Sequence, residues 1–117
     1  MIPAGVEIFF GVAPIDLRWG FDRLAGLVES QLGRGARTGA LFVFFGRRRT
    51  AIKVLFFDGS GLCLFYKRLD AGVFRLPVAE PGQSCVELPS HALDELLDGI
   101  TVEESRRLRS RPRKRYH

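Results

Sequence analysis

A β-hairpin signal limits the possible folds of this chain more than any other feature. Two runs of strand-forming residues, 51–57 and 62–69, flank the turn sequence Asp58-Gly59-Ser60-Gly61. Glycine accepts the positive φ angles that such tight turns need. If Phe57 faces Leu62 across the turn, the alternation of side chains leaves both faces of the hairpin apolar in the middle and cationic at the end far from the turn.

Other segments complete the expected fold, a small α+β domain. Residues 40–45 turn the hairpin into a three-stranded antiparallel meander, and shorter strands are expected at 6–10, 73–76 and 85–88. Asp16 is predicted to cap a helix that runs to about Leu32. Its apolar stripe at helical spacing consists of Phe21, Leu24, Val28 and Leu32. We therefore expect a small antiparallel sheet packed against one long amphipathic helix, with a short C-terminal helix, capped by Ser90, beside it.

Length and composition favour one globular domain. The 117 residues are 46% hydrophobic, which is enough to bury a core. We expect residues 1–102 to form the domain and residues 103–117 to form a basic tail, with a frayed helical turn followed by disorder. No apolar run approaches the roughly 20 residues of a membrane-spanning helix, and the start lacks the pattern of a secretory signal. The predicted location is the cytoplasm, without membrane contact.

The charge is unevenly distributed along the chain. The formal net charge is +5, but residues 47–75 alone carry +5, residues 76–102 carry −5, and residues 103–117 carry +5 again. Two cationic blocks are therefore separated by an anionic one, a pattern that favours contact with polyanions.

Six cations are predicted to converge at one edge of the meander, beside Tyr66. They are Arg47, Arg48, Arg49, Lys53, Lys67 and Arg68. Like charges held together cost stability, and a polyanion such as nucleic acid offsets that repulsion through its phosphates. The tail adds a second group, namely Arg106, Arg107, Arg109, Arg111, Arg113, Lys114 and Arg115. The alternative is that both groups are solvated and only keep the hairpin and the chain end soluble.

No arrangement of residues predicts catalysis. Asp16 and Asp22 lie on different faces of the predicted helix. Ser60 has no histidine at a useful spacing and no surrounding G-x-S-x-G, and the glycines do not match a phosphate-binding loop. No cluster of carboxylates promises a metal site for phosphoryl transfer. We therefore predict a non-enzymatic protein with no cofactor and no catalytic or metal-binding residues.

Several motifs occur in an order that resembles a known family. Residues 16–24 read D-x-R-x-G-F-D-x-L, and residues 64–69 read L-x-x-K-R-L. Between them lie Arg47-Arg48-Arg49, Lys53 and Asp58-Gly59. In this order the motifs closely resemble the second-open-reading-frame accessory protein, often called TnpB, of bacterial insertion sequences of family sixty-six. The likeness extends over residues 2–101, nearly the whole predicted domain.

The resemblance implies a helper of transposition, from an element that also encodes a transposase and a small first-frame protein. It supplies no catalytic residues. We expect an accessory factor that binds DNA or the transposase–DNA complex, with weak sequence preference, because no predicted helix is rich in base-reading side chains. The alternative is a protein-interaction module that docks the transposase or another protein of the element through the aromatic sheet face or the acidic segment 87–98. The sequence does not specify an oligomeric state.

Overall fold

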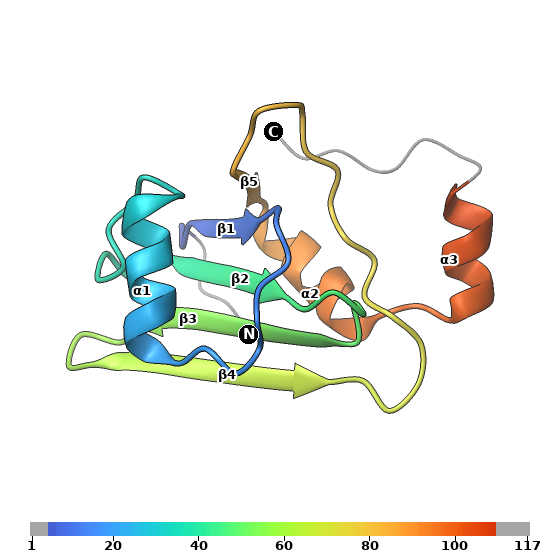
Figure 1. Cartoon of the computed structure of the whole chain (residues 1–117), viewed down its shortest axis with the longest axis horizontal. Helices are drawn as coiled ribbons and strands as arrows, with labels where there is room; N and C mark the ends of the chain where they lie inside the picture. Colours follow the sequence, from blue (N-terminus) through green and yellow to red (C-terminus); the bar gives the residue numbers. More distant parts are fainter. Residues whose placement is uncertain (1–4, 110–117) are drawn as a thin grey trace.

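The computed structural model describes residues 5–109, which fold into one sheet with helices around it (Figure 1). The strands are β1 (Ile8–Gly11), β2 (Leu41–Phe45), β3 (Ala51–Phe57), β4 (Leu62–Arg68) and β5 (Cys85–Leu88). The helices are α1 (Phe21–Ser30), α2 (Ser90–Asp98) and α3 (Val102–Arg109).

The five strands form a mixed sheet in the order β4-β3-β2-β1-β5. Strands β1 and β2 pair in parallel, whereas the other neighbouring strands pair antiparallel. The expected small antiparallel sheet is therefore wrong, although β2, β3 and β4 do form the expected meander within it. Because α1 lies between β1 and β2 in the chain, it carries the backbone back to the end where β1 started, and both strands then run in one direction. The hairpin register is confirmed, since Phe57 pairs with Leu62 and Lys53 with Tyr66.

Helix α1 is much shorter than the predicted helix, which was to begin at Asp16. The Asp16 carboxylate instead binds the backbone N–H and the guanidinium of Arg18, and the Asp16 carbonyl accepts the Trp19 N–H at 3.0 Å in a tight turn. The helix starts only after Gly20, which provides no side-chain cap. Its buried side is made of Leu24, Ala25 and Val28.

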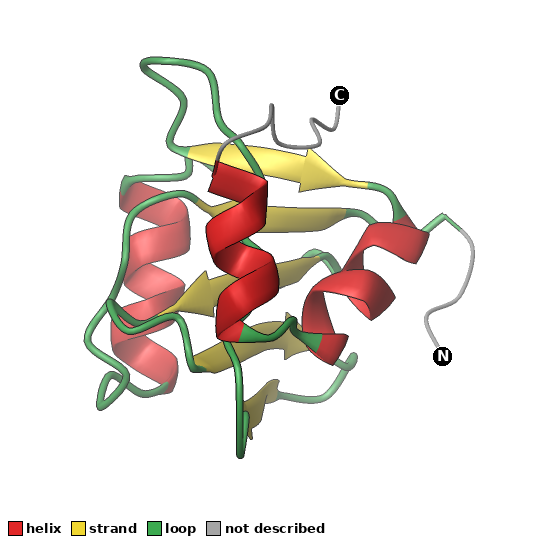
Figure 2. Cartoon of the chain, turned by 90° about the vertical axis from the view of Figure 1, so that its right-hand side faces the viewer, coloured by secondary structure: helices red, strands yellow, loops and turns green. Residues whose placement is uncertain are grey.

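The sheet is covered on both faces, which corrects the expectation of helices on one side (Figure 2). On the α1 face, Phe9, Phe42, Phe44 and Leu55 pack against Leu24 and Val28 of the helix. On the α2 face, a second cluster packs against the helix residues Ala92, Leu93 and Leu96. Its sheet members are Ile8, Phe10, Val43, Phe45, Ile52, Val54, Val86 and Leu88. Strands with two buried faces read as continuous apolar runs, which explains the composition of β1 and β2.

The later part of the chain departs from expectation in smaller ways. The expected strand 73–76 contributes only an isolated bridge between Val73 and Ile100. The predicted strand 85–88 is confirmed as β5. Pro89, not Ser90, occupies the capping position of α2. Helix α3 has eight residues and extends from Val102 into the predicted tail, and Thr101 Oγ1 accepts the Glu104 N–H at 3.0 Å as its cap.

Candidate nucleic-acid interface

The turn between β2 and β3 presents the three consecutive arginines. Arg49 is the only non-glycine residue in the described part of the chain with a positive φ, 58°, and its N–H donates to the Gly46 carbonyl at 2.9 Å. This closes a tight turn over Gly46–Arg49. Arg47 and Arg48 occupy its middle positions and are exposed.

Backbone bonds from a distant segment hold this turn in place. The Thr50 carbonyl accepts the Leu69 N–H at 2.9 Å, and the Arg49 carbonyl accepts the Phe74 N–H at 2.8 Å. Phe74 is completely buried in the cluster on the α2 face. The arginines therefore project from a turn that is anchored at its C-terminal end and not from a loose loop.

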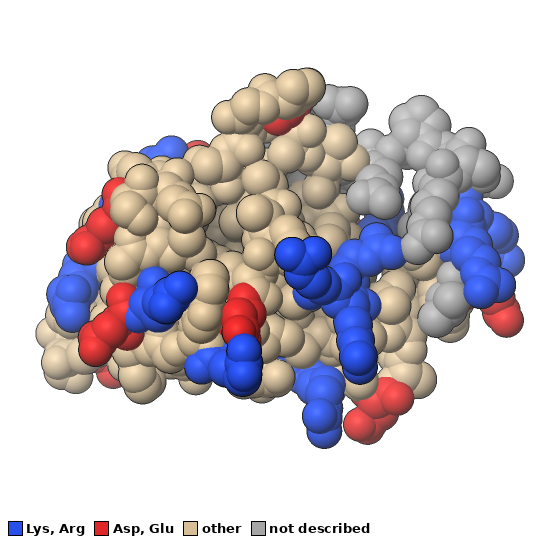
Figure 3. Space-filling view, viewed as in Figure 1, with Lys and Arg blue, Asp and Glu red and all other residues tan. Residues whose placement is uncertain are grey.

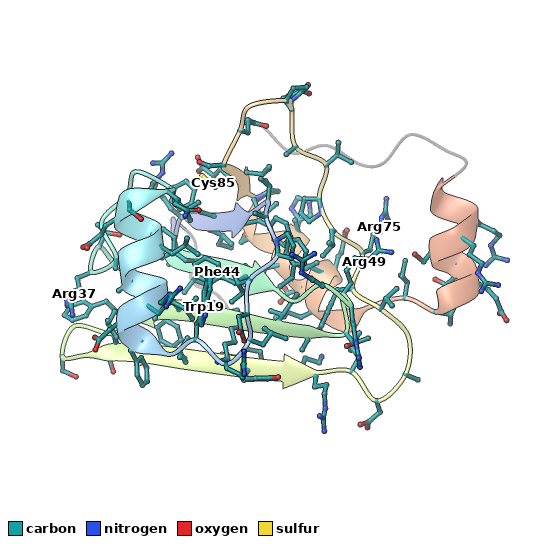
Figure 4. All side chains as sticks on the ribbon, viewed as in Figure 1. Trp19, Arg37, Phe44, Arg49, Arg75 and Cys85 are labelled. Atoms are coloured by element: carbon teal, nitrogen blue, oxygen red, sulfur yellow. The ribbon has the colours of Figure 1, made fainter. Side chains whose placement is uncertain are left out.

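The bond that anchors the turn also places Arg75 at the candidate site. The sequence reasoning did not predict Arg75 as a site residue. Arg75 follows Phe74, so the bond from Phe74 to the Arg49 carbonyl places it beside Arg49, and Figure 4 shows the two side chains as neighbours. Arg75 is half-buried. It belongs to the same basic block of the sequence, but no local pattern indicates its position.

A groove of about 510 Å³ runs between this turn and the segment before α1. The Ile15 N–H donates to the Phe45 carbonyl at 2.9 Å and ties the segment to the end of β2. A Cβ atom on Gly46 would lie only 2.5 Å from Leu17 Cδ1, so glycine permits this close approach. The groove is lined by Pro14, Ile15, Asp16, Leu17, Trp19, Gly46, Arg47, Arg48, Arg49, Thr50 and Ala51.

The one carboxylate in the groove is already neutralised. Arg18 Nη2 lies 2.7 Å from Asp16 Oδ2, and Arg18 Nε lies 3.0 Å from Oδ1. Chiefly through this bidentate contact, the guanidinium lowers the pKa of Asp16 from 3.8 to about 2. The negative charge of Asp16 is thus paired with Arg18. Within residues 5–109, no ion pair links Arg47, Arg48 or Arg68 to a carboxylate.

Lys53 does not join the surface cations, contrary to the predicted convergence. It is 8% exposed on the α1 face of β3. Its ammonium donates to the Trp19 carbonyl at 2.8 Å and lies 5.3 Å from the centre of the Tyr66 ring. Lys53 therefore joins β3 and β4 to the segment that precedes α1.

Lys67 is also directed elsewhere, on the opposite face of the sheet. Its ammonium donates to the Leu97 carbonyl at 2.7 Å, in the last turn of α2. Carbonyl groups at a helix C-terminus lack intrahelical partners, and a cation there also complements the helix dipole. Lys67 thus ties β4 to α2.

The remaining predicted cations are distributed between the turn, the end of β4 and α3. Arg68 pairs with Ala51, the first residue of β3, and is exposed. Arg106 and Arg107 are exposed on α3. Figure 3 shows basic groups over the turn region and over α3 on one face of the molecule. The side chain of Arg109, and Arg111, Arg113, Lys114 and Arg115, lie outside what the structure describes.

Residues 5–109 contain neither a cluster of metal-binding side chains nor a membrane-spanning helix. No three histidine, cysteine, aspartate or glutamate side chains in this range are grouped as metal ligands would be. No helix in the same range has the length and apolar character required to cross a bilayer.

The fold and this surface define a small mixed-sheet domain that displays arginines from an anchored turn. The chain belongs to the IS66 Orf2-like protein family, whose model matches residues 6–107. This confirms the resemblance drawn from the motifs, and places the chain in a family of transposition accessory proteins of insertion sequences.

The chain is also similar to two proteins of Sinorhizobium fredii. It is 41% identical to "Uncharacterized protein y4hO" over 102 residues, which are 86% of this chain and 87% of that protein. It is 35% identical to "Uncharacterized protein y4jC" over 78 residues, 67% of each chain. No solved structure matches.

Proposed function

We propose that this protein is a non-enzymatic accessory factor of insertion-sequence transposition that binds DNA, or the transposase–DNA complex, through an arginine rim. The rim consists of Arg47, Arg48 and Arg68 at the surface, with Arg49 and Arg75 beside them. The observation that carries the proposal is the anchored turn, which holds two exposed arginines at the edge of a groove without a carboxylate partner in the described range 5–109.

The proposed contacts are to phosphates. The guanidinium group presents a planar set of donors that matches phosphate oxygens, and each neutralised phosphate releases counterions. The basic positions of α3 and of the residues after it would add affinity in the same way. Lys53 and Lys67 are left out of the proposed interface, because their ammonium groups already bind backbone carbonyls. None of these contacts reads base edges, so we expect weak sequence preference.

A gel-shift titration with duplex, single-stranded and scrambled DNA tests the proposal. For the variant R47A/R48A, the slope of log affinity against log salt should become shallower by roughly one unit for each lost phosphate contact. R37A is a matched control, because Arg37 is exposed and lies at the far end of the molecule from Arg49 (Figure 4). An unchanged slope in R47A/R48A would reject the rim as the DNA contact.

A second candidate function is a protein-interaction module that docks the transposase or another protein of the element without touching DNA. Helix α2 favours it, since Asp94, Glu95 and Asp98 are exposed on one short helix and form an acidic surface. In that case D94N/D98N would weaken binding to the transposase alone, and DNA affinity would not respond to R47A/R48A.

A further inference from the structure

Strand β4 is an outer strand of the sheet with an open edge. Its neighbour is β3 on one side, and within residues 5–109 no strand pairs with the other side. All seven residues of β4 pair in continuous register with β3, without a bulge or a proline. The other outer strand, β5, has only four residues. Short edge strands, bulges and prolines are the usual protections against edge pairing, and β4 has none of them.

The hydrogen-bond pattern of the hairpin determines which backbone groups of β4 point outward. The Asp58 N–H donates to the Gly61 carbonyl at 3.1 Å, and the Leu69 N–H donates to the Thr50 carbonyl at 2.9 Å. Bonded pairs alternate along an antiparallel ladder, so Cys63, Phe65 and Lys67 bond to β3. The N–H and C=O groups that face the open edge belong to Leu62, Leu64, Tyr66 and Arg68.

Aromatic side chains flank this open edge. The large hydrophobic residues exposed in the described part of the chain are Phe21, Phe65 and Tyr66, and two of them are neighbours on β4. Phe65 is 45% exposed on the α2 face, and Tyr66 is 51% exposed on the α1 face. A lysine often protects such an edge, but the Lys67 ammonium is turned toward the Leu97 carbonyl.

We propose that two copies of this chain associate through antiparallel pairing of their β4 strands, with the two-fold axis at Phe65. In this register Leu62 of one copy pairs with Arg68 of the second copy, and Leu64 pairs with Tyr66. All the outward backbone groups of β4 are then bonded, and the two sheets become continuous. The inference is independent of the proposed DNA contact.

Strand β4 is self-complementary about Phe65, which favours a second copy as the partner. Pairing about Phe65 uses every outward residue of β4 on both chains, and a shift by two residues would leave some of them unbonded. Arg68 faces Leu62 and Lys67 faces Cys63, so no like charges lie opposite one another. Phe65 falls at a non-hydrogen-bonded pair, where side chains approach most closely and aromatic pairs are favourable.

Sedimentation velocity of the full chain tests the association. We expect a species with twice the mass of the 13.1 kDa chain. F65K should sediment as a monomer, because it places two ammonium groups opposite each other on the axis. F21K is the matched control, since Phe21 is similarly exposed (47%) but lies on α1, and it should remain a dimer. A monomeric wild-type chain, or an F65K variant that is still dimeric, would overturn the proposal.

Disulfide trapping tests the register separately. In a background with C63S and C85S, F65C places one thiol on the axis at a pair whose spacing suits a disulfide. Mild oxidation with copper and dissolved oxygen should then link two F65C chains, whereas F21C in the same background should stay unlinked. If F65C cross-links no faster than F21C, Phe65 does not lie on a two-fold axis and the proposed pairing is wrong.

Discussion

Lysines and arginines at the same end of the same hairpin have different surroundings. Lys53 and Lys67 are in-strand residues, and their ammonium groups donate to the carbonyls of Trp19 and Leu97 at 2.8 and 2.7 Å. Arg47 and Arg48 lie in the turn a few residues away and are exposed. Sequence position alone groups all four as one basic cluster. The difference shows that such a cluster can be divided between structural contacts and an open surface.

The difference in surroundings between these lysines and arginines has a simple physical cause. Lys53 lies against the segment before α1 on one face of the sheet, and Lys67 lies against the end of α2 on the other. Arg47 and Arg48, at the middle of the turn, are exposed. The lysine stem is long and flexible, and its ammonium can reach a single carbonyl, whereas the guanidinium fork suits bidentate phosphate contacts.

The largest effect that tests this comparison is expected for K53A. The substitution removes a buried side chain and leaves the Trp19 carbonyl without its donor, which should lower the free energy of unfolding by roughly 2–3 kcal/mol. Urea denaturation measures it. K53M keeps the apolar stem and should recover part of the loss. If K53A were as stable as the wild type, the internal role assigned to Lys53 would be wrong.

A smaller effect is expected for K67A. Lys67 is half-buried and caps the last turn of α2, so we expect a loss of about 1 kcal/mol. Amide hydrogen exchange should also become faster at the C-terminal end of α2 and remain unchanged in α1. Equal acceleration in both helices would indicate general destabilisation and not a lost cap.

Acidification tests two surface carboxylates whose charged forms are stabilised by hydrogen bonds. The N–H groups of Ser60 and Gly61 lower the pKa of Asp58 from 3.8 to about 2, and Arg18 does the same for Asp16. Because the folded-state pKa values are depressed, these carboxylates contribute their full stabilisation above about pH 4, and lose it as the pH falls toward about 2. The melting temperature of D58N, which keeps an oxygen acceptor, should fall less steeply over this range than that of the wild type. Identical slopes would contradict the assignment.

The smallest effect on stability is expected for R47A/R48A. These side chains are exposed and have no ion-pair partner within residues 5–109, so unfolding free energy should change by no more than about 0.5 kcal/mol. The same urea titration used for K53A measures it. A loss as large as that of K53A would show that the arginines stabilise the fold, and would remove the contrast with the lysines.

The local parts of the fold could be predicted, and the non-local parts could not. The hairpin register follows from a short turn and the alternation of side chains, and the structure confirms it. The parallel pairing of Ile8 with Leu41 joins residues that are distant in the chain, and no local pattern specifies it. Helix α1 was predicted too long because the apolar stripe continues to Leu32 and because Asp16 was expected to be the cap, whereas Asp16 binds Arg18 and the helix begins only at Phe21.

The candidate site also has a part that could be predicted from the sequence and a part that could not. The run of three arginines was visible as the basic end of a meander, but Arg75 joins it only through the bond between the Phe74 N–H and the Arg49 carbonyl. The predicted convergence failed for Lys53 and Lys67, because alternation places these residues on opposite faces and both faces are covered. The contribution of the tail residues beyond Arg109 to DNA binding stays a prediction. The boundary between the domain at 1–102 and the tail also stays a prediction.

Read by itself, the sequence determined the family, the existence of the hairpin and its pairing, since these depend on motifs and on residues close together in the chain. Only the tertiary structure decided that β1 lies parallel to β2, that both faces of the sheet are covered, and which cations reach the surface. Those outcomes depend on contacts between segments that are far apart in the chain. The charge of a residue follows from its type, but its exposure depends on the segments that pack over it.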